Sequence, residues 1–268
     1  MFSFFNKKPR SAASLEGIAC DIHSHLIPGI DDGSPDLGTS MLLIRGLIDL
    51  GYRKLITTPH VNSDRFRNTP EIILGGRDRI IQEIRQQGLA VEFGAAAEYL
   101  IDDGFMDGLE RSADFAASSF SPIPPSRQQE PSHLPVFLPL KDNLLLVELS
   151  FYVPVINLKQ VLFDLQLKGY QPVLAHPERY LYFAGNKGWY DQLREIGCLF
   201  QLNLLSFNGH YGREVRALAD YLVKKRYVDF LGTDMHHPGH LEELRHSPAV
   251  YKAVQQILDL GLLKNPSL

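Results

Sequence analysis

Seven short apolar segments recur along the chain, and segments with a helical period separate most of them. The apolar segments are continuous rather than alternating, which is typical of strands that are covered on both faces. They span residues 17–25, 54–60, 91–99, 143–150, 171–177, 198–204 and 228–234. The pattern therefore predicts a parallel sheet with helices packed against it.

The segments between these runs predict amphipathic helices. One apolar stripe runs from Leu37 to Leu50 and ends at Gly51, a typical helix-ending glycine, while Ser34 and Pro35 before it suit an N-cap and a first turn. The other expected helices span about residues 70–87, 154–168, 210–226 and 248–260. Repeated strand–helix units with right-handed crossovers predict an α/β barrel related to the eight-stranded one, with one strand fewer.

The length of 268 residues and an apolar content of 44% suit one large domain. We expect a flexible N-terminal segment over 1–16 and a single barrel domain over 17–268. Residues 118–143 carry six prolines and neither a helical nor a strand period, so they predict a long loop. That loop is either a tolerated insertion or a lid that contacts substrate.

Charge and cysteine content exclude several classes of protein. The net charge is −4 without a basic stripe, which argues against a nucleic-acid partner. No apolar run approaches the roughly 20 residues of a membrane helix, so we expect no stable membrane insertion. The two cysteines, Cys20 and Cys198, lie in no CxxC pattern and fit a cytoplasmic protein. Cysteine-based phosphatase chemistry requires an arginine six residues later, where this chain has Leu26 and Leu204.

Polar side chains gather at the carboxyl ends of the predicted strands. They are His23, His25, His60, Glu98, Glu148, His176, Asp234 and His236, together with Asp31 or Asp32 from the loop after the first strand. The carboxyl ends of the strands in a parallel barrel meet at one mouth, where the active sites of such barrels lie. Only the sixth strand, with Asn203 near its end, offers no strong ligand.

Each of these residues alone has an ordinary structural explanation, such as a hydrogen-bonded histidine or a turn aspartate. Together they would repel one another and be poorly solvated, unless divalent cations joined them. Imidazole and carboxylate ligands without thiolate favour Mn, Fe or Zn, and nine ligands exceed what one site uses, so we expect two or three metal ions. Asp21 would either orient a histidine ligand or make an ordinary buried hydrogen bond.

Six motifs resemble the polymerase-and-histidinol-phosphatase (PHP) superfamily: "DIHSHLIPGIDDGS", "TTPHV", "AEYL", "LVELS", "LAHPERY" and "GTDMHH". They are most similar to its manganese-dependent protein-tyrosine phosphatases, which are encoded with bacterial capsule and exopolysaccharide genes. The resemblance covers about residues 17–265. It implies a distorted (β/α)7 TIM-like barrel, the PHP fold, with three metal ions. The implied ligands are His23, His25, Asp32, His60, Glu98, Glu148, His176, Asp234 and His236.

The resemblance also implies that Arg179 binds phosphate, which a guanidinium fork can do with two parallel hydrogen bonds. The alternative is a surface ion pair with Glu178. We also assign catalytic roles to His176 and Asp32. The family often has a second phosphate-binding arginine after the "DMH" motif; in this chain the role is either absent or filled by one of three candidates. These candidates are His237, His240 and Arg245.

The expected function is hydrolysis of phosphotyrosine on a protein, such as a bacterial tyrosine kinase that regulates capsule or exopolysaccharide synthesis. A small-molecule phosphatase of the histidinol-phosphate type and a non-catalytic regulatory module that keeps the fold are the alternatives. Phe151 and Tyr152, after the fourth strand, would either flank an aromatic substrate ring or pack against the barrel. The sequence leaves the oligomeric state open.

Overall fold

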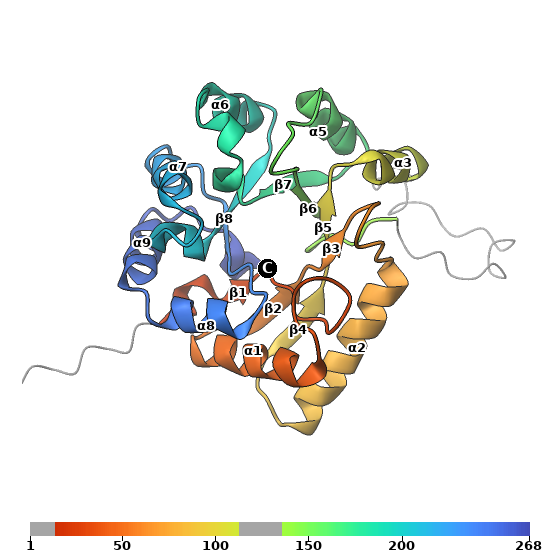
Figure 1. Ribbon diagram of the computed structural model, residues 1–268, viewed down its shortest axis with the longest axis vertical. Coiled ribbons are helices and arrows are strands. Elements are labelled where there is room, and N and C mark those ends of the chain that lie inside the picture. Colours follow the sequence, from red (N-terminus) through yellow and green to blue (C-terminus); the bar gives the residue numbers. More distant parts are fainter. Residues whose placement is uncertain (1–13, 113–135) are drawn as a thin grey trace, which may run out of the picture.

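The computed structural model describes residues 14–112 and 136–268, in which helices surround a central group of parallel strands (Figure 1). The strands are β1 (Cys20–Asp21), β2 (Lys54–Thr57), β3 (His60–Val61), β4 (Glu92–Ala95), β5 (Glu98–Leu100), β6 (Leu144–Glu148), β7 (Gln171–Ala175), β8 (Leu199–Asn203) and β9 (Phe230–Gly232). Each pairing between these strands is parallel, as the sequence predicted.

The strands form two sheets, ordered β1-β2-β4 and β3-β5-β6-β7-β8-β9. The predicted strands over 54–60 and 91–99 are each divided in two, so the prediction of single continuous strands there was wrong. Pro59 lies at the first break and has no N–H to donate to a neighbouring strand. Glu98 N still donates to Pro59 O at 3.1 Å, so the two segments of the chain stay side by side across both breaks.

The two sheets also meet where β1 and β9 end. Ser24 and Met235 form a parallel bridge just beyond these strands. Asp234 N donates to His23 O at 2.7 Å, and His25 N donates to Met235 O at 2.9 Å. The first and last strands of the chain therefore bring their polar carboxyl ends into direct contact.

The α-helices are α1 (Leu37–Asp49), α2 (Pro70–Gln86), α3 (Asp103–Arg111), α5 (Leu158–Leu167), α6 (Gly188–Glu195), α7 (Arg213–Lys224), α8 (Pro238–Arg245) and α9 (Pro248–Asp259). Three of them, α3, α6 and α8, were not predicted, because eight or nine residues give too short a window for a clear helical period. The predicted N-cap of α1 was wrong as well. Asp36 caps this helix by accepting from Thr39 N at 2.8 Å, while Ser34 is buried against Ser40.

The apolar core has two parts. The larger part packs the helices against the strands. The smaller part draws on most strands and includes Ile22, Ile56, Ala96, Leu146, Val173, Ala175 and Phe230. Several of these residues lie close in sequence to the polar strand ends, so the site rests on a packed apolar layer.

Two predicted segments fall largely outside the described residues, namely the N-terminal segment 1–16 and the loop 118–143. The described end of the loop packs Phe137, Leu138 and Leu140 into the core, with Tyr99 OH accepting from Leu138 N at 2.8 Å. None of the described helices has the length and apolar character needed to cross a membrane.

Candidate metal centre

Histidines and carboxylates from both sheets converge on one cluster. Most lie at or just beyond the carboxyl ends of strands, whereas His60 and Glu98, which were predicted near strand ends, begin β3 and β5. These side chains form four overlapping groups, and within each group the potential ligand atoms all lie within 4.8 Å of one another. The groups are His25, His60 and His236; His23, His176 and Asp234; His23, His25 and Glu98; and His60, Glu98 and Glu148. Eight of the nine predicted ligands therefore share one cluster, and the ninth, Asp32, lies at its edge.

Glu98 lies in the middle of the cluster and is fully buried. Its Oε2 is 3.1 Å from both His23 Nε2 and His60 Nδ1, and its Oε1 is 3.0 Å from His176 Nε2. His60 Nδ1 also lies 2.9 Å from Glu148 Oε1. One carboxylate thus faces three imidazoles that come from three different strand ends.

Asp234 has a matching place on the other side of His23. Its Oδ1 lies 3.4 Å from His23 Nε2, His25 Nε2 and His236 Nδ1. The side chains therefore form two neighbouring sets, one around Glu98 and one around Asp234. His23 and His25 lie close to both carboxylates and so belong to both sets. Such shared ligands suit metal ions that lie close together.

The two adjacent aspartates of the first loop have different roles. Asp31 is largely buried, and its Oδ2 accepts from His25 Nδ1 at 2.8 Å. Burial alone would raise the pKa of the Asp31 carboxyl, but His25 lowers it to about 2. Asp32 is 43% exposed, with Oδ1 at 3.5 Å from His60 Nε2 and 3.7 Å from His236 Nε2. Asp31 therefore orients a histidine, whereas Asp32 faces the cluster.

A chain of amides orients His23 and Asp234. Gln201 Oε1 accepts from His23 Nδ1 at 2.7 Å, and Gln201 Nε2 donates to Asn203 Oδ1 at 2.9 Å. Asn203 Nδ2 then donates to Asp234 Oδ2 at 2.7 Å. Sequence reasoning missed Gln201, although two amides at a spacing of two in a buried strand were a usable signal. The bond to Nδ1 leaves His23 Nε2 to face the cluster.

Asp21 makes the ordinary buried hydrogen bonds that were its alternative interpretation. Its oxygens accept from Thr233 N and Thr233 Oγ1, each at 2.9 Å. Burial raises the pKa of Asp21 to about 6. The residue braces β1 against the segment that leads to Asp234.

Several buried polar atoms in the cluster fit a metal ion. His23 Nε2, His25 Nε2 and Glu98 Oε2 are buried and make no hydrogen bond with any described residue. Burial would raise the pKa of Glu98, but His23 and His60 hold it well below its usual value, so the carboxylate is ionised. Unpaired nitrogen and oxygen atoms that point at one another are costly unless a cation joins them. The residues therefore suit divalent metal ions.

The backbone is unusual where it presents these ligands. His176 and Asp234 both adopt left-handed conformations, with φ of 33° and 49°. Such conformations cost on the order of 1–3 kcal/mol each and are concentrated at functional sites. Glycine permits close approach at two other places, because a Cβ on Gly33 would lie 2.3 Å from His25 Cβ and one on Gly232 would lie 2.7 Å from His23 Cβ.

A pocket of about 290 Å³ opens onto the cluster. It is lined by Asp32, His60, Glu148, Phe151, His176, Arg179, Tyr211, Asp234, His236, His237 and His240. Arg179 Nη1 donates to Asp234 Oδ2 at 2.9 Å. The guanidinium carbon lies 4.4 Å from the centre of the Phe151 ring and 4.2 Å from that of Tyr211. The arginine is thus held between two aromatic rings in the wall of the pocket.

The alternative role for Arg179, a surface ion pair with Glu178, is not seen: Arg179 pairs with Asp234. Glu178 is fully buried and accepts from Asn203 N at 2.8 Å and from Ser206 Oγ at 2.7 Å. Both acceptor bonds tie the short 3₁₀-helix η3 (Pro177–Arg179) to the end of β8 and the helix η5 (Leu204–Asn208). Glu178 therefore fixes the turn that carries Arg179.

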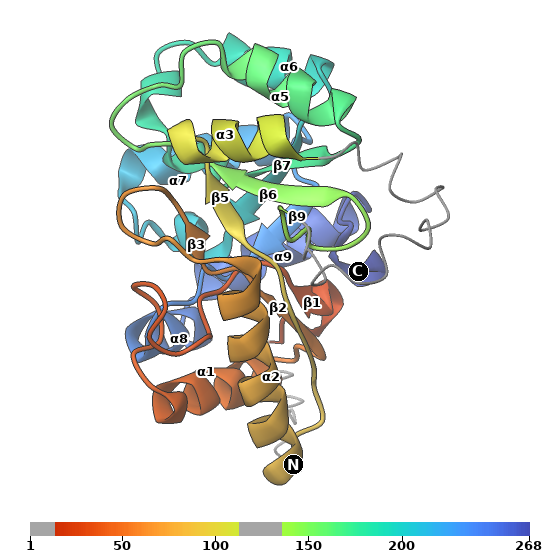
Figure 2. The same cartoon turned by 90° about the vertical axis from the view of Figure 1, so that its right-hand side faces the viewer.

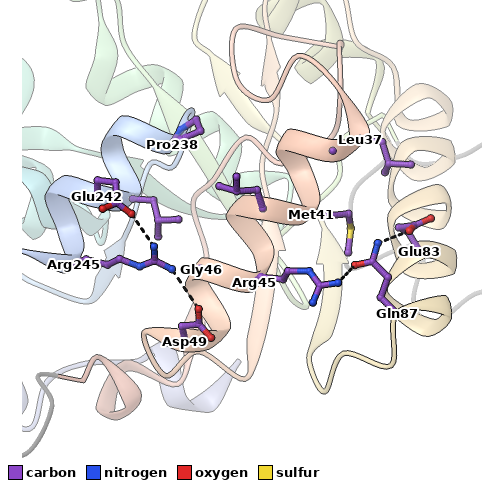
Figure 3. A pocket seen from close by; sticks show the side chains of 13 residues that line it. Leu37, Met41, Arg45, Gly46, Asp49, Glu83, Gln87, Pro238, Glu242 and Arg245 are labelled. Carbon is purple, nitrogen blue, oxygen red and sulfur yellow. Dashed lines mark hydrogen bonds and ion pairs between the residues drawn. The ribbon is translucent and has the colours of Figure 1, made fainter.

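Arg245, one of the three candidates for a second phosphate ligand, does not line this pocket. It points into a separate groove between α1, α2 and α8, where it donates to Glu242 at 2.7 Å and to Asp49 at 3.3 Å (Figure 3). His237 and His240 do line the pocket. Of the three candidates for the missing arginine, the two histidines are therefore in position.

Comparison with known proteins places the chain in one family. The family model described as "Capsular polysaccharide synthesis, CpsB/CapC" matches residues 19–119 and 138–258. Tyrosine-protein phosphatase YwqE of Bacillus subtilis is 30% identical over 218 residues, which are 81% of this chain and 76% of that protein. Tyrosine-protein phosphatase CpsB of Streptococcus pneumoniae is 25% identical over 225 residues, 81% of this chain and 82% of that protein.

One of two solved structures agrees with this assignment, and the other shares only the fold. One is described as YwqE from Bacillus subtilis and CpsB from Streptococcus pneumoniae, "unique metal-dependent tyrosine phosphatases". It matches with a TM-score of 0.68 at 26% identity and covers 92% of this chain and 94% of that chain. A histidinol phosphate phosphatase from Lactococcus lactis, at a TM-score of 0.50, 14% identity and coverage of 91% and 93%, shows a shared fold alone. The family expected from the motifs is confirmed: the chain belongs to the CpsB/CapC family of capsular polysaccharide synthesis.

Proposed function

We propose that this protein is a metal-dependent phosphatase that hydrolyses phosphotyrosine on a protein. The observation that carries the proposal is the single pocket in which a cluster of metal-ligand side chains meets Arg179. The relatives named above are tyrosine-protein phosphatases, and one solved structure is described as metal-dependent. These names support a protein substrate over a small molecule.

The proposed metal ligands are the nine side chains at the strand ends. They are His23, His25, Asp32, His60, Glu98, Glu148, His176, Asp234 and His236. Nitrogen and oxygen donors without thiolate suit two or three ions of Mn, Fe or Zn, and we propose Mn. Bound metal ions would supply Lewis-acid stabilisation of the phosphoryl oxygens and an activated water as the nucleophile.

Arg179 is the proposed phosphate-binding residue. The bond to Asp234 uses one of the five N–H donors of the guanidinium and fixes the fork in the pocket wall. From there the positive charge would stabilise the charge that develops on the phosphoryl oxygens during in-line attack. His176 and Asp32 line the same pocket, which supports the proposal that each holds a cation and contacts the phosphate or the attacking water.

Both cysteines are unsuited to act as the nucleophile. Cys20 and Cys198 are buried, and burial raises the pKa of each thiol to about 12. Only the thiolate is a good nucleophile, so these groups are inert at neutral pH. Two free thiols also fit the cytoplasm, which is the compartment we propose.

The proposed architecture is a distorted (β/α)7 TIM-like barrel, the PHP fold, in one domain over residues 17–268. The bridge between Ser24 and Met235, which links the first and last strands, supports a closed barrel. The proposed substrate is a bacterial tyrosine kinase that regulates capsule synthesis, in keeping with the name of the family. The net charge of −4 supports a protein rather than a nucleic-acid partner.

The test is turnover by metal-stripped protein to which Mn, Fe, Zn and Mg are added back separately. We expect hydrolysis of p-nitrophenyl phosphate and of a phosphotyrosine peptide to return with Mn and to remain absent without metal. Histidinol phosphate serves as the small-molecule comparison and should be hydrolysed much more slowly than the peptide. A protein that binds these metals and yet hydrolyses none of the three substrates would refute the proposal.

A further inference from the structure

The loop between β6 and α5 leaves an unusual run of apolar side chains exposed. Phe151 is 39% exposed, Tyr152 91%, Val153 65% and Ile156 85%. We call these four residues the apolar lip. Single exposed apolar residues are common on protein surfaces, but a contiguous group more often marks an interaction site.

Hydrogen bonds and packing hold this loop in place. Ser150 Oγ accepts from Tyr152 N at 3.2 Å and from Val153 N at 3.3 Å, and Ser150 O accepts from Tyr182 OH at 3.0 Å. Val155 contributes to a small apolar pocket together with Trp189 and neighbouring residues. The exposed side chains are therefore presented by a braced turn.

The apolar lip begins inside the candidate active site. Phe151 lines the pocket, stacks on the Arg179 guanidinium and lies 5.5 Å from the His176 ring, measured between ring centres. Figure 2 shows the green loop between β6 and α5 on the same side of the strands as the brown loop after β3. A molecule whose phosphate reached Arg179 would therefore have the apolar lip beside it.

The chemistry of the apolar lip restricts what it can bind. Residues 149–157 contain no charged side chain, so the lip would not attract phosphate or a charged peptide segment. A second copy of this chain packed over Phe151 would close the pocket that the proposed function requires to be open. The remaining fit is an apolar segment that enters together with the phosphate.

We infer that the apolar lip recognises apolar side chains next to the phosphotyrosine of a protein substrate. This inference rests on the proposed function and adds which kind of residue flanks the phosphotyrosine in the substrate. The phosphotyrosine ring would pass beside Phe151, and the neighbouring residues of the substrate would cover Tyr152, Val153 and Ile156. Burial of one medium-sized apolar side chain favours binding by roughly tenfold or more.

The test uses two phosphotyrosine peptides that differ only in the residues flanking the phosphotyrosine, Leu and Ile in one and Ser in the other. Wild-type protein loaded with Mn should show a kcat/KM at least about tenfold higher for the apolar peptide. The double variant Val153→Ser, Ile156→Ser should lose this preference and retain turnover of p-nitrophenyl phosphate, which is too small to reach these two residues. Tyr152→Ser is the second variant, in case the double variant fails to fold.

The matched control is Leu167→Ser, which removes a 66% exposed apolar side chain at the far end of α5. It should leave the peptide preference unchanged. Equal kcat/KM for both peptides in the wild type, or an intact preference in the lip variants, would overturn the inference alone. A third outcome would also overturn it: sedimentation shows that the wild type is a dimer, the lip variants are monomers, and the peptide preference is the same in both. Failure of every metal-loaded sample to hydrolyse any substrate would instead refute the proposed function, and the inference with it.

Discussion

Two buried aspartates lie beyond opposite ends of β9 and have very different surroundings. Asp229, before the strand, forms ion pairs with Arg194 and with Lys264, the latter at 3.1 Å, and accepts from Phe200 N at 2.9 Å. Its charge is therefore balanced by cations that belong to the chain. Such an arrangement stabilises the fold and needs no ligand.

Among the described residues, Asp234, after the strand, has Arg179 as its one permanently charged partner and three imidazoles within 3.4 Å. Burial alone would raise the pKa of Asp234, but His23 and the other neighbouring basic side chains hold it well below its usual value. An imidazole that is to bind metal must be neutral, so the protein itself offers too little fixed positive charge here. The difference between the two ends of one strand separates a structural carboxylate from one that we propose as a metal ligand.

The largest expected effect comes from Asp234→Ala. The change removes a proposed metal ligand that lies close to three histidines, and it also removes the partner of Arg179. We expect kcat/KM for a phosphotyrosine peptide to fall by about 10³-fold or more, because both losses act together. Metal content, measured by elemental analysis, should fall as well, while the thermal unfolding midpoint stays close to that of the metal-free wild type. Full metal content together with full turnover would show that Asp234 is not a ligand.

Arg179→Ala should have the next largest effect and should leave the metal in place. Loss of one group that stabilises transition-state charge typically costs about 10²- to 10³-fold in turnover. We therefore expect kcat/KM to fall in that range, with weaker inhibition by inorganic phosphate. Arg179→Lys should recover only part of the loss, because an ammonium lacks the planar fork. Metal loss in the alanine variant would mean that Arg179 acts mainly by holding Asp234.

The sequence predicted which polar side chains converge better than it predicted the bounds of the strands. The rule that parallel strands end at a common mouth brought together residues as distant as His23 and Asp234, and it needs only the type and order of elements. Pro59 lies inside the second predicted strand, and a proline at such a position indicates an interruption, but the prediction did not include one. The helices α3, α6 and α8 are too short to show a clear helical period. Short helices are stabilised mainly by tertiary packing, which the local sequence does not reveal.

Roles within the site were harder to assign. Asp31 and Asp32 are adjacent and chemically identical, so only the loop conformation decides which one contacts His25. Gln201 gave a weak signal, because a buried glutamine is more often a structural hydrogen-bonding residue than a partner of a metal ligand. The same limit explains why an ion pair with Glu178 remained an alternative for Arg179. The two residues are neighbours in sequence, but the carboxylate of Glu178 accepts from Asn203 and Ser206 instead.

Asp31→Asn should have a smaller effect than either change above. The amide keeps the shape of the side chain but no longer offers His25 Nδ1–H a charged acceptor. Outer partners of ligating histidines typically contribute 10- to 100-fold in metal affinity, so we expect the Mn dissociation constant to rise by about that factor. Turnover at saturating Mn should be nearly that of the wild type. Titration of the metal-stripped variant with Mn measures both, and an unchanged dissociation constant would contradict the orienting role.

The smallest effect on turnover is expected for Asp229→Ala, at the structural end of β9. The change leaves the partly buried Arg194 and the exposed Lys264 without their shared carboxylate, and Phe200 N without its acceptor, which should lower the free energy of unfolding by about 2–4 kcal/mol in urea titrations. Metal content and kcat/KM of the folded protein should stay within about twofold of wild type, because the cluster lies beyond the other end of the strand. Asp78→Ala is the matched control, since it removes an exposed ion pair with Arg77 and should cost less than about 1 kcal/mol. If Asp229→Ala instead lost metal at unchanged stability, the two ends of β9 would not be independent, and the distinction between a structural and a metal-binding carboxylate would fail.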